Sequence, residues 1–132
     1  MFPSLLLVDD DENIVYLLKE ILEEEGFEVD LAYNGVSAVQ KITPGKYAAI
    51  LLDFVLPDMR GDAVAEGIRG IDPGAGLILL TGFKQAIDPV RLKVFNRVLE
   101  KPAHPEKVLA AISEVLRERQ LSLTSMVINA EN

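Results

Sequence analysis

The sequence predicts a single α/β domain with a parallel sheet that is covered by helices on both faces. Five short apolar runs alternate with five segments of helical periodicity. The central apolar runs are continuous rather than alternating, which is typical of strands buried on both faces. Strands that alternate with helices favour right-handed crossover units, and such units build a parallel sheet with helices on both sides.

The composition is that of one folded domain. Of the 132 residues, 49% are hydrophobic and 26% are charged, a balance that favours a soluble globular chain over a disordered one. No apolar run reaches the roughly 18–20 residues of a membrane-spanning helix. Residues 1–8 are apolar but lack a preceding basic region, so we interpret them as a strand rather than a signal peptide, and we expect a cytoplasmic protein.

The charge and the cysteine count exclude other classes of function. The formal net charge is −8, and the largest basic cluster, at 117–119, is surrounded by glutamates. Because nucleic-acid binding needs a basic surface that neutralises phosphates, we expect no direct nucleic-acid partner. The chain has no cysteine, which excludes disulfides and thiolate metal sites.

A strand at Leu5–Val8 and a helix at Glu12–Glu25 open the chain. The strand stops at three consecutive acids. The helix places apolar residues three and four positions apart, so that they share one helical face; they are Ile14, Leu17, Leu18, Ile21 and Leu22. Gly26 ends the helix, because glycine readily adopts the conformation that follows many helix C-termini.

A second strand, a second helix and a third strand follow. Phe27–Ala32 has the pattern of a strand. Asn34 precedes a glycine, which indicates a turn and a helix cap, and we expect this helix to end near Ile42. Proline and glycine at 44–45 break it. Ala48–Leu52 is a continuous apolar run and predicts a strand that is buried on both faces.

The next region predicts a loop, a helix and a fourth strand. Leu56–Gly61 contains proline and glycine and predicts a loop, in which Asp58 is a loop or cap residue. We expect Asp62 to cap a short helix that ends at about Arg69. An Asp-Pro-Gly turn comes next. Leu77–Leu80 predicts a fourth buried strand.

The last part of the chain completes the alternation. Asp88–Val94 predicts at most a short helix, Arg97–Leu99 a short fifth strand, and Pro105–Arg119 an amphipathic helix. We therefore predict a domain at residues 1–119. Residues 120–132 are expected to form a C-terminal tail that either extends the last helix or is disordered.

Polar side chains follow four of the predicted strands, directly at their carboxyl ends. They are Asp9, Asp10 and Asp11 after the first strand, Asp53 after the third, Thr81 after the fourth and Lys101 after the fifth. The carboxyl ends of parallel strands lie along one edge of a sheet, and ligands of such folds bind at that edge. We therefore expect these side chains to lie close together.

This combination of side chains predicts phosphoryl transfer to a carboxylate. Clustered carboxylates repel one another unless a cation lies among them, and Mg²⁺ prefers such oxygen ligands. A carboxylate can also act as a nucleophile and form an aspartyl-phosphate. Lys101 would supply positive charge and Thr81 a hydroxyl donor for the transferred group. Taken singly, each residue has a structural interpretation, such as a helix cap for Asp11.

Four segments resemble the signature segments of response-regulator receiver domains, the CheY-like domains of two-component signal transduction. The segments are LLLVDDDENI, AAILLDFVLPDMRGDAV, LILLTGF and VLEKPAHPEKVLAAI, and the resemblance covers residues 4–118. It implies a flavodoxin-like, doubly wound (βα)5 fold with strand order 2-1-3-4-5. It also implies a phosphoprotein of two-component or phosphorelay signalling, which accepts a phosphoryl group from a histidine kinase or phosphotransfer domain and switches conformation.

The resemblance assigns roles to residues by position. Asp53 would be the phosphoacceptor. Asp10 and Asp53 would ligate Mg²⁺ or Mn²⁺, Asp9 would act on the ion through water, and the backbone carbonyl of Val55 would be a third protein ligand. Lys101 would contact the phosphoryl group, and its bond to the following proline resembles the family's cis peptide bond. Such a domain catalyses only its own phosphorylation and slow dephosphorylation, so we do not expect an enzyme in the usual sense.

The sequence departs from the family pattern near the fifth strand. The family usually has tyrosine or phenylalanine where this chain has Val98, so the coupling of an aromatic ring to Thr81 is not expected here. The interval from Thr81 to Lys101 is also shorter than usual. The resemblance allows a weak homodimer, but these departures weaken any inference about its geometry. In this family the residues two positions after the phosphoacceptor and two positions after the threonine flank the path of the hydrolytic water. Here they are Val55 and Phe83, which predict a long-lived phosphorylated state unless Phe83 packs into the adjacent loop or core.

Two other functions and one question of context stay open at this point. A phosphatase of the haloacid-dehalogenase type would share Asp53, Mg²⁺, a threonine and a lysine, but it needs an acid at the position of Val55. An interaction module that is not phosphorylated would keep the fold alone. The sequence is equally compatible with a free-standing regulator and with a piece of a hybrid kinase or multidomain regulator, and it identifies neither the kinase nor the output.

Overall fold

Five parallel strands form the centre of the computed structural model, which describes the backbone of residues 2–131 and the side chains of residues 2–121. The strands lie in the order β2-β1-β3-β4-β5, as the resemblance implies. They are β1 (Ser4–Val8), β2 (Glu28–Ala32), β3 (Ala49–Leu52), β4 (Leu77–Thr81) and β5 (Arg97–Glu100). Each lies within about one residue of its predicted range.

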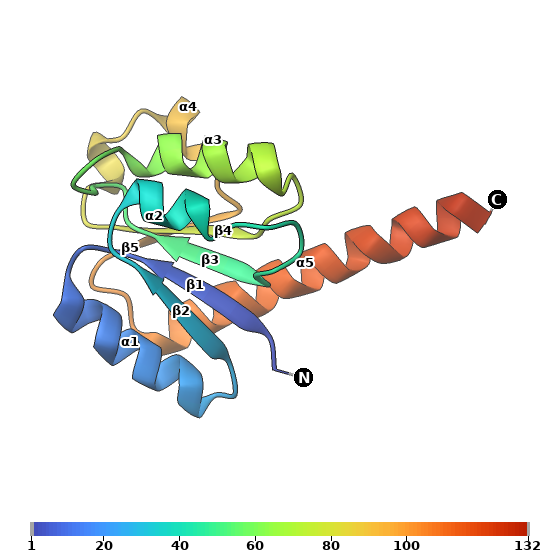
Figure 1. Cartoon of the computed structure of the whole chain (residues 1–132), viewed down its shortest axis with the longest axis horizontal. Coiled ribbons are helices and arrows are strands. Elements are labelled where there is room, and N and C mark those ends of the chain that lie inside the picture. Colours follow the sequence, from blue (N-terminus) through green and yellow to red (C-terminus); the bar gives the residue numbers. More distant parts are fainter. Residues whose placement is uncertain (1, 132) are drawn as a thin grey trace.

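Helices cover both faces of the sheet (Figure 1). They are α1 (Glu12–Glu24), α2 (Gly35–Gln40), α3 (Gly61–Ile71), α4 (Pro89–Leu92) and α5 (Pro105–Glu131), with a 3₁₀ turn, η1, at Lys84–Ala86. The expected signals operate at two helix ends. Gly26 follows α1 with a φ of 96°, and Asn34 caps α2 by accepting a hydrogen bond from the Ser37 N–H.

The prediction that Asp62 caps α3 is wrong. The helix begins at Gly61, two residues earlier than a cap at Asp62 would give, and Arg60 holds the N-cap position without a side-chain hydrogen bond. The reason lies in the preceding loop, which folds back so that the Gly61 N–H donates to the Phe54 carbonyl at 2.7 Å. Asp62 is buried inside the first turn, where its carboxylate pairs with Arg91 at 2.9 Å.

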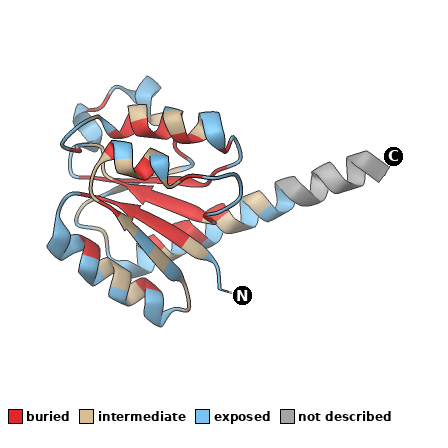
Figure 2. Ribbon diagram, in the orientation of Figure 1, coloured by how far each residue is buried: buried red, intermediate tan, exposed pale blue. Residues whose placement is uncertain are grey.

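The core consists of two apolar layers, one on each face of the sheet. Every residue of β3 and β4 is buried, which explains the continuous apolar runs of these strands, and Figure 2 shows the burial concentrated in the sheet and on the inner helix faces. One layer packs beneath α2 and α3 and includes Leu6, Ile50 and Ile68. The other packs beneath α1 and α5 and includes Leu22 and Ile112.

Helix α5 continues beyond the predicted domain boundary at residue 119. Its backbone is helical as far as Glu131, whereas Asn132 and the side chains of residues 122–131 lie outside the described residues. The domain limits of 1–119 and 120–132 therefore stay predictions. Within the described part of the chain, no helix combines the length and the apolar character needed to cross a membrane.

Candidate functional site

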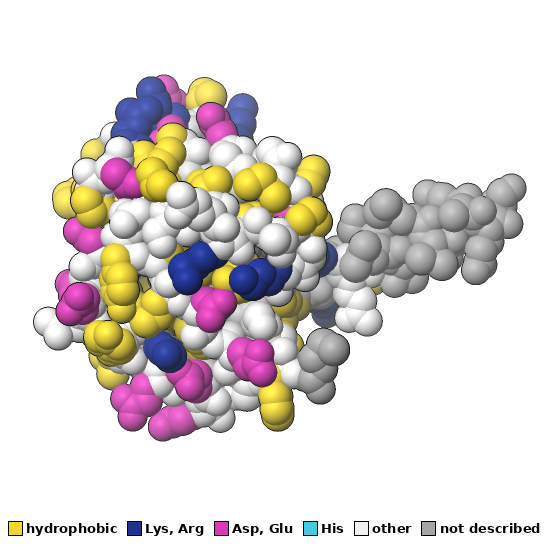
Figure 3. All heavy atoms as spheres, in the orientation of Figure 1, with side chains coloured by type: hydrophobic (Ala, Val, Ile, Leu, Met, Phe, Trp, Pro, Cys, Tyr) yellow, Lys and Arg dark blue, Asp and Glu magenta, His cyan; other side chains and the backbone are white. Residues whose placement is uncertain are grey.

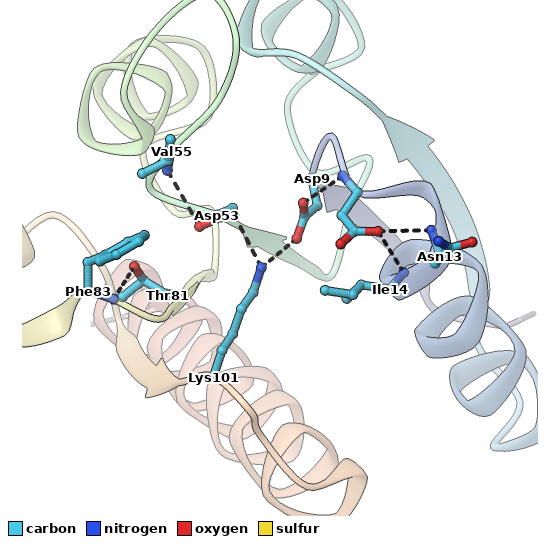
Figure 4. A network of polar contacts seen from close by, with 9 residues as sticks. Asp9, Asn13, Ile14, Asp53, Val55, Thr81, Phe83 and Lys101 are labelled. Atoms are coloured by element: carbon cyan, nitrogen blue, oxygen red, sulfur yellow. Dashed lines mark hydrogen bonds and ion pairs between the residues drawn. The ribbon is translucent and has the colours of Figure 1, made fainter.

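The sheet itself brings the predicted site residues together at its carboxyl edge. Asp9 directly follows β1, Asp53 follows β3, Thr81 ends β4 and Lys101 follows β5. Strand-like backbone hydrogen bonds continue into these residues. The Asp53 N–H donates to the Val8 carbonyl at 3.0 Å, and the Lys101 N–H donates to the Thr81 carbonyl at 2.9 Å. The side chains therefore start from rigid positions on neighbouring strands (Figure 4).

Three carboxylates form a cluster at this edge. Asp9, Asp10 and Asp53 each offer a carboxylate oxygen, and these oxygens lie within 4.8 Å of one another. Asp9 is buried, Asp53 is half-buried and Asp10 is exposed, so the cluster opens to solvent on one side. Several oxygen ligands with room for water suit a hard divalent cation such as Mg²⁺ or Mn²⁺. The donor set therefore fits the predicted ion.

Lys101 lies between two of these carboxylates. Its Nζ donates to Asp9 Oδ2 at 2.7 Å and to Asp53 Oδ2 at 3.2 Å. Burial alone would lower the pKa of Lys101, but the hydrogen bond to Asp9 and the charges of Asp53 and Asp9 outweigh it and raise the pKa. The ammonium thus stays charged beside the cluster. The peptide bond to Pro102 is cis, as the resemblance implies.

Asp53 has an electrostatic environment different from that of a surface carboxylate. Burial raises the pKa of Asp53, and the charge and hydrogen bond of Lys101 oppose this rise without cancelling it. The Val55 N–H also donates to Asp53 Oδ1 at 3.4 Å. Lys101 therefore helps to keep a half-buried carboxylate in its ionised form, which is the form that acts as a nucleophile.

The third acid of the run, Asp11, does not join the cluster. Its carboxylate caps α1 by accepting from the Asn13 N–H at 3.1 Å and the Ile14 N–H at 3.4 Å. Its own N–H donates to Asp9 Oδ1 at 3.0 Å, which fixes the Asp9 carboxylate. The interpretation of Asp11 as a helix cap agrees with this geometry, and the backbone of the cap supports the cluster.

Thr81 and its neighbours border the site on the side of β4. Thr81 is fully buried, and its Oγ1 accepts from the Phe83 N–H at 3.1 Å. Phe83 and Val55 are 61% and 53% exposed, and in the view of Figure 4 both lie on the side of Asp53 away from Asp9. Phe83 is therefore not packed into the core. Val98 is half-buried and packs against the core beneath α3.

Two features of the site were not predicted from the sequence. Gly61 packs directly on the backbone that follows β3, since a Cβ there would lie 2.6 Å from the Asp53 carbonyl oxygen. Asp58 accepts hydrogen bonds from the backbone of Gly35 and Val36. The packing of Gly61 has a signal in the sequence, because glycine lowers helix propensity and yet stands at the start of a helix. Nothing local signals the second, because its partners are more than 20 residues away.

Known proteins that resemble this chain share its architecture. The sequence model of the response regulator receiver domain matches residues 5–113. The "Transcriptional regulatory protein CpxR homolog" of Haemophilus influenzae is 36% identical over 130 residues, which is 97% of this chain and 56% of that protein. The chain spans about half the length of the curated relatives that it matches.

Two solved structures are similar over most of the chain. A response regulator receiver domain protein (CheY-like) from Methanospirillum hungatei has a TM-score of 0.84 and 30% identity, and the match covers 92% of this chain and 99% of that one. The response regulator TrrA from Thermotoga maritima, in complex with Mg(2+)-BeF, has a TM-score of 0.80 and 32% identity, with coverages of 86% and 99%. Family model, relatives and fold agree, and the chain belongs to the response regulator receiver domains of two-component signalling.

Proposed function

We propose that Asp53 accepts a phosphoryl group from a phosphohistidine of a histidine kinase or phosphotransfer domain, in a reaction that needs Mg²⁺ or Mn²⁺. One observation carries this proposal. The Lys101 ammonium bonds to both Asp9 and Asp53 within a cluster of three carboxylates. Purely structural ion pairs do not need a third carboxylate that opens to solvent, whereas a site for a cation and a phosphoryl group does.

The chain's own residues account for the transfer. An Asp53 carboxylate oxygen forms a bond to phosphorus while the bond between phosphorus and the donor's histidine nitrogen breaks, and the imidazole leaves. Lys101 already contacts Asp53 at 3.2 Å and provides positive charge beside the transferred oxygens. The Thr81 hydroxyl can rotate to donate to one of them, because its hydrogen is not fixed by the bond that it accepts from Phe83.

Asp9, Asp10 and Asp53 would hold the divalent cation together with the carbonyl of Val55. When bound, the ion supplies positive charge that balances the carboxylates and the transferred group. The relative TrrA was solved in complex with Mg(2+)-BeF, which supports this part of the proposal. Asp9 would act on the ion through water, because Lys101 and the Asp11 N–H already occupy its oxygens.

Phosphorylation would shift an existing conformational equilibrium rather than create a new state. Thr81 and Lys101 are the groups drawn toward the phosphoryl oxygens. Their backbones are joined directly, because the Lys101 N–H donates to the Thr81 carbonyl. Val98 has no ring to swing into a vacated space, and it packs on the core. The change on the surface of β4 and β5 would therefore be smaller than an aromatic side chain would give.

We further propose a cytoplasmic receiver domain at residues 1–119 that acts on no separate substrate. Val55, two residues after Asp53, cannot transfer a proton, which argues against the phosphatase alternative. On the face seen in Figure 3, basic side chains gather over α4 and elsewhere mix with acidic and apolar ones. The formal net charge of −8 nevertheless supports a domain without direct nucleic-acid contact. The curated relatives are named transcriptional regulatory proteins, so DNA contact would belong to another part of such a protein.

Incubation with acetyl phosphate tests the function directly. Intact-protein mass spectrometry is expected to show one added phosphoryl group with Mg²⁺ and none after removal of the ion with EDTA. A wild-type chain that stays unmodified with both reagents present, while a known receiver domain is labelled beside it, contradicts the proposal. The unmodified interaction module would then be the better interpretation.

The affinity for Mg²⁺ should depend strongly on Asp10 and little on Asp11. Asp10→Ala removes one of three clustered carboxylates, so we expect Mg²⁺ affinity to fall by about tenfold or more. Asp11→Ala removes the cap of α1 and leaves the cluster intact, so the affinity should change little. NMR titration of both variants with Mg²⁺ measures the difference. If Asp11→Ala weakened binding more than Asp10→Ala, the assignment of ligands at this acidic run would be wrong.

The phosphorylated state should decay slowly. Val55 and Phe83 are exposed beside Asp53, and neither side chain can orient a water molecule for in-line attack. Polar replacements, Val55→Asn with Phe83→Glu, are therefore expected to speed the loss of phosphate severalfold. Decay can be followed by mass spectrometry after removal of acetyl phosphate. Equal lifetimes of wild type and double variant would show that these residues do not control hydrolysis.

A further inference from the structure

The loop that carries the phosphoacceptor, residues 53–60 between β3 and α3, is closed at its base. The Gly61 N–H donates to the Phe54 carbonyl at 2.7 Å, and Val55 pairs with Arg60 in an isolated antiparallel bridge. The expected carbonyl ligand, Val55, therefore belongs to a small folded-back unit. Its position depends on how firmly the rest of that unit is held.

The tip of this loop is attached to α2. Asp58 Oδ1 accepts from the Gly35 N–H at 2.7 Å, and Asp58 Oδ2 accepts from the Val36 N–H at 2.9 Å. The first N–H groups of a helix have no partner within it, so one carboxylate satisfies two of them. These two bonds lower the pKa of Asp58, and the bond from Val36 has the larger effect. The contact is thus a charge-assisted pair of bonds across 23 residues of sequence.

A second contact holds the tip at the same point. The Met59 side chain lies directly over Gly35, since a Cβ on Gly35 would lie 2.3 Å from Met59 Cγ and 2.6 Å from its Sδ. Gly35 is buried, whereas Asp58 is exposed. The absence of a side chain at Gly35 therefore allows the loop backbone to approach α2 closely enough for Asp58 to reach both N–H groups.

We propose that Asp58 is a positioning residue for the phosphorylation site. It touches neither the ion nor the phosphoryl group. Instead, it fixes the tip of the loop to α2, so that the Val55 carbonyl and the Asp53 carboxylate are ordered before the ion arrives. This inference rests on the proposed function. Without Asp58 the ordering of the loop would have to accompany ion binding, and its entropic cost would reduce the affinity.

A matched control separates positioning from stabilisation of α2. Asn34 also satisfies the N-terminus of α2, because its Oδ1 accepts from the Ser37 N–H at 2.8 Å. Asn34→Ala therefore removes the same kind of hydrogen bond from the same helix end, but Asn34 lies outside the loop. Asp58→Asn keeps one acceptor oxygen at the tip and serves as the conservative variant.

The experiment is an Mg²⁺ titration of wild type and the three variants, followed by amide NMR because the chain has no tryptophan. Asp58→Ala is expected to weaken Mg²⁺ binding about tenfold, Asp58→Asn less, and Asn34→Ala by no more than about twofold. The thermal midpoint of each metal-free variant is measured beside it. If Asp58→Ala does not fold, the Mg²⁺ affinities of Asp58→Asn and Asn34→Ala are compared instead, and the lower affinity is expected for Asp58→Asn.

Two results would overturn the inference. One is wild-type Mg²⁺ affinity in Asp58→Ala. The other is an equal loss of affinity in Asn34→Ala, which would show that the order of α2 alone matters. Failure of the proposed function looks different, because wild type itself would then remain unlabelled by acetyl phosphate.

Discussion

Replacement of Asp53 by asparagine is expected to abolish phosphorylation altogether. The amide preserves the shape of the side chain but removes the anionic oxygen that attacks phosphorus. It also removes the charge partner of Lys101, whose Nζ lies 3.2 Å from Asp53 Oδ2. Mass spectrometry after treatment with acetyl phosphate and Mg²⁺ should therefore show one phosphoryl group on wild type and none on Asp53→Asn.

Asp11→Asn provides the control for this experiment. Asp11 lies beside the two acids of the cluster but caps α1, and asparagine is an equally good cap. This variant should be labelled like wild type. Labelling of Asp53→Asn at the wild-type level would place the phosphoacceptor elsewhere, and peptide mapping would then identify it.

Gly61→Ala is expected to destabilise the domain and to disturb the site at the same time. Alanine favours a helix over glycine by up to about 1 kcal/mol, so propensity alone predicts stabilisation. However, the new Cβ would lie 2.6 Å from the Asp53 carbonyl oxygen and 2.8 Å from Phe54 Cα. These are backbone atoms that cannot rotate away, and overpacking of this kind costs about 1–3 kcal/mol. The steric term should therefore exceed the gain in propensity.

Gly70→Ala is the matched substitution within the same helix. Gly70 lies near the end of α3, and a Cβ there meets no atom within 4 Å. This variant should gain about 0.5–1 kcal/mol. Urea unfolding of both variants gives the two free energies, and acetyl phosphate labelling gives the effect on the site. A stabilised Gly61→Ala with normal labelling would show that the loop yields easily, and that Gly61 does not position Asp53.

Most of the fold could be predicted because its signals are local or repeat along the chain. The buried runs of β3 and β4 and the caps at Asn34 and Gly26 are short-range patterns, and the structure bears them out. The gathering of Asp9, Asp53, Thr81 and Lys101 at one edge followed from parallel strands alone.

The parts that could not be predicted depend on contacts between distant segments. Asp62 is a residue type that often caps helices. However, Arg60 pairs with Val55 in the preceding loop, and the helix begins directly after it, at Gly61. Asp62 is buried instead against Arg91, 29 residues away. The partners of Asp58 on α2 are equally remote. Propensity describes one segment at a time, and these positions are determined by packing between segments.

The ion pair of Lys101 with Asp9 also determines when during synthesis the site can exist. It joins residues that lie 92 positions apart, so its formation requires closure of a long loop of the chain. A domain is made from its N-terminus, and the three acids are present long before the lysine. Until β5 has paired with β4, the carboxylates lack their ammonium partner. We therefore expect a nascent or truncated chain without β5 to be unable to receive a phosphoryl group, which confines the signal to completely folded molecules.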